Sequence, residues 1–122
     1  MVKIVIGGQM AKEEILNAVT ACGGDRVIVK KSNDMQAAME VKAGAADFYL
    51  GSCNTGGGGS LAMAIAMCGY GQCVTVASPG KVMSAEEMKA QVQSGKKCFG
   101  FVPESINTVV PVLVEAMIAK KG

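Results

Sequence analysis

The sequence predicts a single α/β domain over residues 1–122, in which a five-stranded, mostly parallel β-sheet lies between two layers of helices. Short apolar runs of strand length alternate with segments of helical period along the whole chain. Half of the residues are hydrophobic and 18% are charged, which is typical of a well-packed sheet covered on both faces. Together with a length that suits one domain, these observations predict a three-layer, Rossmann-like architecture.

The first half of the chain is expected to form three strands separated by two helices. The strands cover three apolar runs: Lys3 to Ile6, Arg26 to Lys30 and Asp47 to Ser52. The first helix is expected to open at Gly7-Gly8 and to end at Gly23-Gly24, because apolar residues recur between them at helical spacing. The second helix follows the cap candidates Ser32-Asn33-Asp34 and ends at Gly44. Its inward face is expected to hold three residues: Met35, Ala38 and Met39.

The second half begins with a helix that carries no polar residue. Leu61 to Cys68 is apolar on every side, which is typical of a helix packed in the middle of a structure. Its methionines, like those of the preceding helix, are expected to fill the core. Two further strands are expected at Gln72 to Ala77 and at Cys98 to Val102.

The remaining helices are predicted from their caps. Ser84 and Glu87 form a capping-box pattern for a charged outer helix that ends near Gln93. The last helix is expected from Thr108 to Lys120, with Pro111 in the first turn, where a missing N–H costs no hydrogen bond. The predicted strand order is 2-1-3-4-5, the order of doubly wound sheets that bind ligands at the carboxyl ends of their strands.

Composition excludes several classes of function. A net charge of +2, scattered lysines and 4% aromatic residues predict no nucleic-acid partner. The absence of histidine removes the side chain that most often acts as an acid or base near neutral pH, and five cysteines without a Cys-x-x-Cys pair predict reduced thiols. No metal and no cofactor are expected. A strand directly after Met1 leaves no room for a signal peptide, so a cytoplasmic location is expected.

A glycine-rich loop connects the third strand to the following helix. A strand that ends in such a loop directs backbone N–H groups and the positive end of the helix dipole to one point, which is typical of an anion site. The alternative is a tight turn against a crowded neighbour, in which the glycines serve packing alone. The sequence favours a ligand-binding loop formed by seven consecutive residues: Asn54, Thr55, Gly56, Gly57, Gly58, Gly59 and Ser60.

Cys53 begins this loop and is the candidate catalytic residue. A thiol beside a helix N-terminus is expected to have a lowered pKa and to serve as a nucleophile or base. Because the first and third strands are predicted to be neighbours, Gly8 and Gln9 should lie beside the loop and contact the same ligand. An enzyme would also need a second acid or base, for which Asp47, Glu104 and a residue of a partner subunit are the candidates.

The loop resembles that of ribose-5-phosphate isomerase B and related sugar-phosphate isomerases. The matching residues are Val41, Gly44, Asp47, Cys53, Thr55, Gly56, Gly58, Ser60 and Ala62. The resemblance implies a Rossmann-like sheet, a role for Cys53 as the base that moves a proton between neighbouring carbons, and a homo-oligomer with sites between subunits. The sequence departs from that family at Gln9-Met10, where the family has Asp-His. It also lacks the family's arginine clamp for substrate phosphate, since its only arginine is Arg26.

Over its whole length the sequence is similar to the YhfU-like bacterial proteins of unknown function. The similarity includes the loop from Gly51 to Gly56 and the helix from Met35 to Gly44. It implies an accessory component of transport or metabolism and names no reaction.

Two classes of function follow from the sequence. The first is a protein that binds a small phosphorylated or carboxylated metabolite at the loop, with isomerase-like proton transfer at Cys53 as its catalytic form. The second is a non-catalytic accessory subunit that docks on a membrane transporter or an enzyme complex, with its apolar residues as the interface. Phosphocysteine transfer ranks below both, because Cys53 follows the third strand rather than the first.

Overall fold

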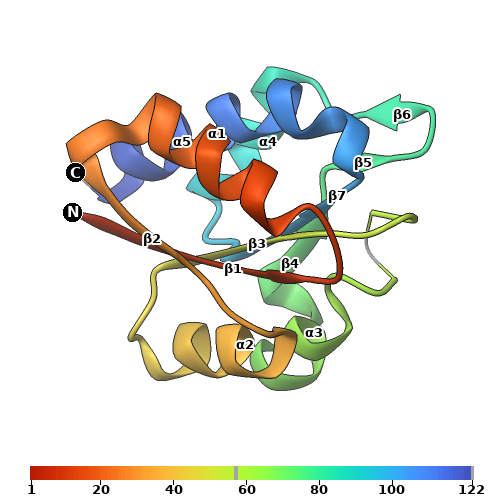
Figure 1. The fold of residues 1–122 in the computed structure, drawn as a ribbon, viewed down its shortest axis with the longest axis horizontal. Helices are drawn as coiled ribbons and strands as arrows, with labels where there is room; N and C mark the ends of the chain where they lie inside the picture. The colour runs from red at the N-terminus through yellow and green to blue at the C-terminus, as the bar shows by residue number, and fades with distance from the viewer. Residues whose placement is uncertain (57, 122) are drawn as a thin grey trace.

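A five-stranded parallel sheet forms the centre of the protein in the computed structural model, which describes residues 1–56 and 58–121 (Figure 1). The strands, in chain order, are β1 (Val2–Gly8), β2 (Val27–Lys31), β3 (Phe48–Ser52), β4 (Cys73–Thr75) and β7 (Cys98–Phe101). Every pairing among them is parallel. A separate antiparallel hairpin follows β4 and consists of β5 (Ala77–Ser78) and β6 (Lys81–Val82).

Five α-helices cover the two faces of the sheet (Figure 1). One face carries α1 (Lys12–Gly23), α4 (Ala85–Gln93) and α5 (Ile106–Lys121), and the other carries α2 (Asp34–Ala43) and α3 (Ala62–Cys68). Short 3₁₀ turns occupy Gly24–Arg26, Tyr70–Gln72 and Pro103–Ser105. This arrangement confirms the predicted three-layer α/β fold.

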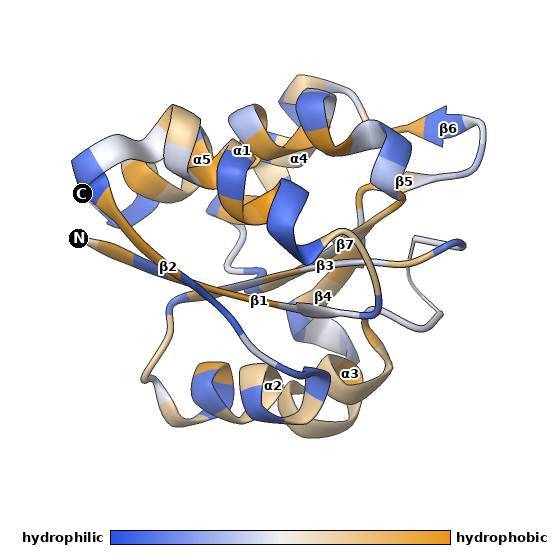
Figure 2. Cartoon of the chain, viewed as in Figure 1, coloured by the Kyte–Doolittle hydropathy of each residue, from blue (hydrophilic) through white to orange (hydrophobic). Residues whose placement is uncertain are grey.

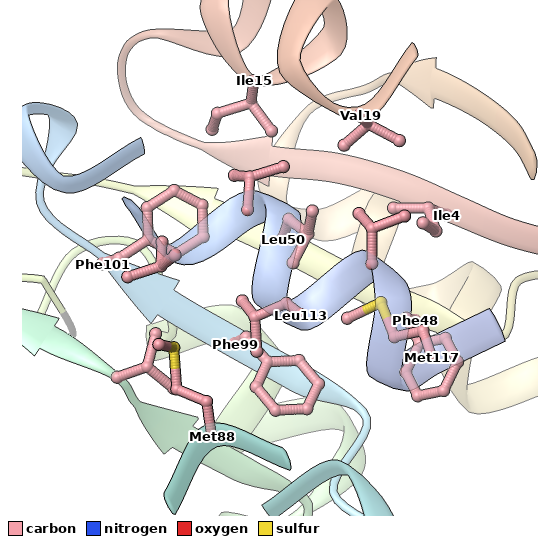
Figure 3. Packing of buried hydrophobic residues seen from close by; sticks show 14 of the residues in the cluster. Ile4, Ile15, Val19, Phe48, Leu50, Met88, Phe99, Phe101, Leu113 and Met117 are labelled. Atoms are coloured by element: carbon pink, nitrogen blue, oxygen red, sulfur yellow. The ribbon is translucent and has the colours of Figure 1, made fainter. Parts of the chain in front are cut away.

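The two faces of the sheet contribute to two separate cores. The larger lies under α1, α4 and α5, where Leu113 and Met117 of α5 pack on the strand residues and Phe48 and Phe99 lie with ring centroids 6.3 Å apart (Figure 3). The smaller lies under α2 and α3 and is built from Val5, Tyr49 and short side chains such as Ala37, Ala64 and Cys98. Burial of these apolar side chains is the main stabilising contribution to the fold.

The predicted helix caps of α2 and α4 are confirmed. Asn33 caps α2 by accepting a hydrogen bond from the Gln36 N–H at 2.8 Å, and Gly44 ends that helix with φ 81°. Ser84 and Glu87 form the expected capping box at the start of α4.

The predicted strand order is wrong at one edge of the sheet. The observed order is β2-β1-β3-β7-β4, so the last strand lies between the third and the fourth. Right-handed crossovers explain this, because connections through opposite faces step in opposite directions along a sheet. The connections through α2 and α3 step away from β2, whereas α4 packs with α1 and α5 on the other face. The chain therefore steps back after β4, and β4 stays at the edge.

Two helix boundaries also differ from the prediction. Gly7 and Gly8 do not open α1; they extend β1, and α1 begins only at Lys12, after Ala11 with φ 59°. The helix α5 begins at Ile106, so Pro111 lies inside it rather than in its first turn. The proline cannot donate to the carbonyl of Asn107, an exposed residue whose carbonyl can bond to water instead.

The methionines of α2 and α3 do not fill the core as predicted. Met35, Met39 and Met63 are 53%, 45% and 37% exposed. Ala38 is buried as predicted, and the other buried residues of α2 are Ala37 and Val41. The helix α3 is apolar throughout, as Figure 2 shows, yet only Ala64 is fully buried within it. It lies on the surface because no further helix covers the α2–α3 layer in the described part of the chain.

Among residues 1–56 and 58–121, none of the helices has the length and apolar character needed to cross a lipid bilayer.

Candidate functional site

The candidate site lies where β1, β3 and β7 end at the same edge of the sheet. Gly8 is the register partner of Ser52, and Ser52 is the partner of Phe101. Gln9 continues this edge through a hydrogen bond from its N–H to the Ser52 carbonyl at 3.1 Å, and the Cys53 N–H bonds to the Phe101 carbonyl at 3.3 Å. The strand pairing thus brings Gly8 and Gln9 beside the Cys53 loop, as the sequence predicted.

Close packing accounts for two of the loop glycines. Gly56 has φ 89°, and a side chain there would overlap the carbonyl of Ala77 in β5. A Cβ at Gly59 would lie 2.7 Å from the side-chain oxygen of Gln9. Gly56 requires glycine because backbone blocks a side chain there, whereas a side chain at Gly59 would have to displace the exposed side chain of Gln9. The loop therefore lies against the β5–β6 hairpin on one side and against Gln9 on the other.

The remaining loop residues divide into a buried group and an exposed group. Cys53, Gly56 and Ser60 are buried, whereas Asn54, Thr55 and Gly58 are exposed and Gly59 is half-buried. Gly57, which the sequence also assigns to the site, lies outside the described residues. The helix α3 runs from Ala62 to Cys68 with Leu61 as its N-cap residue, so the loop leads into the predicted helix, whose first turn has no side-chain cap.

Cys53 is 4% exposed, and its sulfur lies 3.4 Å from the Thr55 Oγ1 atom. Burial raises the pKa of the thiol, but hydrogen bonds from the hydroxyls and backbone N–H groups of Ser60 and Thr55 outweigh burial and lower the pKa to about 6. Such a thiol is mostly ionised at neutral pH, so the side chain can act as a base or a nucleophile.

Ser60 connects the thiol to the rest of the loop. Its hydroxyl donates to the Gly56 carbonyl at 3.0 Å, and its own carbonyl accepts a hydrogen bond from the buried hydroxyl of Tyr49. A hydroxyl carries one hydrogen, so the Ser60 hydroxyl donates either to Gly56 or to the Cys53 sulfur. Ionisation of Cys53 favours the second arrangement, because a charged acceptor makes the stronger hydrogen bond.

A cleft of about 840 Å³ opens beside the loop and runs along the edge strand β4. Its walls include Thr55, Gly58, Leu61, Ile65, Thr75 and Lys96. This volume lies within the range of about 300–1,000 Å³ that is typical of small-molecule sites. The cleft thus offers hydroxyl groups near the loop, apolar side chains along α3 and one ammonium group, on Lys96.

The second acid or base that the sequence placed at Asp47 is not near Cys53. Asp47 precedes β3 and therefore lies at the opposite end of the sheet, where it accepts hydrogen bonds from the Lys3 N–H at 2.8 Å and from Lys121 at 2.9 Å. Burial raises its pKa, but these two partners outweigh burial and lower it. Glu104 follows β7 in the Pro103–Ser105 turn and is exposed, and none of its described contacts joins it to the loop.

Sequence reasoning missed Tyr49, which lies within β3 and whose hydroxyl donates to the Ser60 carbonyl of the Cys53 loop. Its ring covers Gly7 and Gly51, where an added Cβ would lie 2.6 Å and 2.9 Å from ring carbons. These two glycines are register partners on neighbouring strands. The signal in the sequence is a tyrosine two residues before a strand glycine, since glycine in a strand often marks a close approach.

The other four cysteines differ from Cys53 in their surroundings. All five cysteines carry free thiols. Cys73 and Cys98 are register partners on β4 and β7, and a hydrogen bond between their thiols, together with burial, raises the pKa of Cys98, while the same hydrogen bond lowers the pKa of Cys73. Burial raises the pKa of Cys22 and Cys68. The pKa of Cys73 is therefore lowered by a second thiol, whereas that of Cys53 is lowered by the loop residues Thr55 and Ser60.

Comparison of structures identifies the fold. The chain is similar to the crystal structure of a ribose 5-phosphate isomerase RpiB from Thermotoga maritima, with a TM-score of 0.60, 17% identity, and coverage of 98% of this chain and 84% of that chain. At this level of identity, the likeness concerns the fold alone.

Comparison of sequences identifies the family. The chain is 38% identical over 114 residues to the uncharacterized protein YhfU of Escherichia coli strain K12 and to that of Shigella flexneri, which covers 93% of this chain and 97% of each relative. Residues 2–117 match the family described as protein of unknown function DUF2620. The chain therefore belongs to the DUF2620 family.

Proposed function

We propose that this protein binds a small phosphorylated or carboxylated metabolite in the cleft beside the Cys53 loop and moves a proton on it with the Cys53 thiolate. The observation that carries the proposal is a buried thiol at the start of the loop, with the Thr55 Oγ1 atom 3.4 Å from its sulfur and with a pKa that Thr55 and Ser60 lower to about 6. Free cysteines are usually buried as neutral side chains, and a group of donors around one favours the charged form.

The expected reaction is isomerase-like. The thiolate takes the proton from a hydroxyl-bearing carbon next to a carbonyl group, the C–H electron pair forms the C=C bond of an enediolate, and the carbonyl electron pair moves onto its oxygen. The S–H group then returns the proton to the former carbonyl carbon, while the hydroxyl proton of the first carbon moves to the former carbonyl oxygen, so that the carbonyl group re-forms on the first carbon. The exposed loop residues Asn54, Thr55 and Gly58 are expected to contact the ligand, with Gln9 at the rim. The likeness of the fold to a sugar-phosphate isomerase supports this reaction class.

The chemistry of the cleft supports an anionic ligand. Lys96 is the cationic side chain of its wall, and the Nζ atom of Lys96 donates to the Gly71 carbonyl at 2.8 Å, with further N–H donors free for an anion. The chain's only arginine, Arg26, pairs with Glu115 at 3.4 Å and does not line the cleft. A phosphate or carboxylate would therefore be held by Lys96 and by the loop, without the bidentate grip of an arginine.

Ligand-dependent stabilisation tests binding. The thermal unfolding midpoint of the wild-type protein is measured with phosphate, sugar phosphates, phosphonates and small carboxylates. The same measurements are made on the variants Gly58→Val and Gly71→Ala. Gly58 lines the cleft, whereas a Cβ at Gly71 would meet no atom within 4 Å. A ligand at a hundred times its Kd adds about 2.7 kcal/mol of stability. Stabilisation by one class that Gly58→Val abolishes and Gly71→Ala retains supports the site; no stabilisation by any class contradicts it.

Proton exchange tests catalysis separately. With a stabilising ligand in heavy water, the wild-type protein should wash deuterium into the carbon next to the carbonyl group, and Cys53→Ser should lose this exchange while it still binds. Binding without exchange in either protein would establish a sensor or carrier in place of an enzyme.

A second candidate function is supported by the exposed apolar surface of α2 and α3. We define this surface as Met35, Met39, Met63 and Tyr70, of which Tyr70 is 78% exposed. Large apolar side chains that gather on one layer are typical of a protein interface. A homo-oligomer would cover them with a second copy, and an accessory subunit would cover them with a transporter or enzyme. A cytoplasmic location belongs to both proposals.

A further inference from the structure

We propose that Tyr49 is the positioning residue of the Cys53 site: its buried hydroxyl holds the carbonyl of Ser60 and thereby fixes the end of the loop that begins at Cys53. The inference deepens the proposed function and rests on it, since it concerns the group that would take the proton.

Two glycines leave the space that the ring of Tyr49 occupies. Tyr49 and Gly51 lie on the same face of β3, and Gly7 is the neighbour of Gly51 on β1. A Cβ at Gly7 would lie 2.6 Å from ring carbon Cε2, and one at Gly51 would lie 2.9 Å from Cε1. Only glycine at both positions lets the ring extend along the sheet toward its carboxyl edge.

The ring ends at the carbonyl of Ser60. The Tyr49 hydroxyl, which is fully buried, donates to that oxygen, and the same oxygen would lie 3.2 Å from a Cβ at Gly51. Ser60 itself is 1% exposed. The loop is therefore fixed to the sheet at this residue by a buried hydrogen bond in a site that excludes water, where a bond of this kind is strongest.

Tyr49 is suited to remain a donor at every pH at which the protein works. Burial and the negative charge of Asp34 both raise its pKa well above the ordinary range, against a smaller opposite effect of the Gly8 N–H. The phenol thus stays protonated while Cys53 ionises. A tyrosine that ionised would lose its hydrogen and release the Ser60 carbonyl.

The consequence for Cys53 follows from the geometry of residue 60. Its carbonyl accepts from Tyr49, its hydroxyl donates to the Gly56 carbonyl at 3.0 Å, and Ser60 is, with Thr55, one of the two residues that lower the pKa of Cys53. If the carbonyl is released, the residue can turn and move away from the sulfur. Tyr49 thus acts on the thiol through Ser60, without touching the reacting atom.

Two readouts on Tyr49→Phe test the inference. The phenylalanine keeps the ring over Gly7 and Gly51 and removes the donor alone. Amide hydrogen exchange of the loop residues should become roughly five-fold faster or more. The thiolate absorbance that is lost in Cys53→Ser should titrate roughly 0.5 to 1 pH unit higher than in the wild type. The matched control is Tyr70→Phe, which removes the hydroxyl of the exposed tyrosine and should change neither readout.

A double-mutant cycle with Ser60→Ala shows whether Tyr49 acts through Ser60. Each single variant should raise the titration midpoint of Cys53, and the double variant should raise it by clearly less than the sum. Unchanged exchange and an unchanged midpoint in Tyr49→Phe would overturn the inference, as would fully additive shifts. A wild-type Cys53 that titrates near an ordinary thiol value would instead overturn the proposed function, and the exchange measurement would still decide whether Tyr49 holds the loop.

Discussion

At the scale of single residues, the surroundings of Cys53 are the feature with chemical consequences. The sequence predicted a lowered pKa from the start of the following helix, whereas in the structure Thr55 and Ser60 of the loop lower the pKa against the effect of burial. Hydroxyls and N–H groups within the loop are local donors that burial protects from water. The pKa of the thiol is therefore lowered as predicted, but by loop residues rather than by the helix.

A pH dependence of stability follows from this thiol. The pKa of Cys53 is lowered in the folded protein, to about 6 from 9.0, so the folded state binds the proton less tightly than the unfolded state. The stabilising contribution is therefore complete above the unfolded value and is lost as the pH falls through the folded value. Between these two values, the stability of the wild type relative to Cys53→Ser should rise by about 1.4 kcal/mol per pH unit.

Denaturant unfolding of both proteins across this range measures the difference. Cys22→Ser provides the control, because the pKa of Cys22 is raised by burial and its removal adds no rising difference over the same range. A constant difference between wild type and Cys53→Ser would contradict the lowered pKa.

Alanine substitutions at three glycines distinguish how a positive φ and a lack of space each change the free energy of unfolding. Gly71→Ala should change stability little, because its Cβ meets nothing and its φ is not positive; Gly44→Ala should cost about 1–2 kcal/mol for φ 81° alone. Gly56→Ala should cost more than Gly44→Ala, because φ 89° is combined with overlap on the Ala77 carbonyl. Urea unfolding gives the three values, and equal costs at Gly44 and Gly56 would show that the loop can move away from the hairpin.

At the scale of elements, the helix caps were predicted correctly, whereas the glycine pair Gly7-Gly8 was not. The capping box at Ser84 and the cap at Asn33 were predicted correctly, since a cap depends on residues within one turn. Gly7 and Gly8 were assigned to a turn, but they extend β1, because Tyr49 of the neighbouring strand needs the space above Gly7. That contact joins residues far apart in the sequence.

The capping box supplies the prediction at this scale. Ser84→Ala should destabilise the protein by about 1 kcal/mol, since the Ser84 Oγ atom accepts from the Glu87 N–H at 3.2 Å at the start of α4. Ser94→Ala is the matched control, because Ser94 stands at the other end of the same helix and its hydroxyl only donates to the Gln91 carbonyl. Thermal unfolding of the two variants should separate them clearly, and equal losses would contradict a capping role.

At the scale of the whole molecule, the sheet face on which each helix packs decides which apolar side chains are exposed to solvent. Within the described residues, three helices close the larger core, while α2 and α3 cover the opposite face. The surface of Met35, Met39, Met63 and Tyr70 therefore stays open to a partner. The sequence predicted that the methionines fill the core, because apolar residues at helical spacing usually do. The spacing does not show which helix layer is left exposed to solvent.

Self-association through this surface is the prediction at the molecular scale. The wild-type protein should form an oligomer in sedimentation experiments over a range of concentrations, and Met63→Lys should shift it toward the monomer. Val82→Lys, which replaces a side chain that is 46% exposed on the β5–β6 hairpin, should leave the oligomer intact. A wild-type monomer at every concentration would favour the accessory-subunit function over the homo-oligomer.

The sequence by itself determined the fold class, most of the strands and helices, two helix caps and the neighbourhood of Gly8, Gln9 and the Cys53 loop. These depend on local period, local caps and the adjacency of the first and third strands. The tertiary structure alone decided the place of β4 at the sheet edge, the exposure of α3 and the role of Tyr49. Each of these depends on which face a helix packs against or on a contact across the sheet, and neither leaves a periodic signal along the chain.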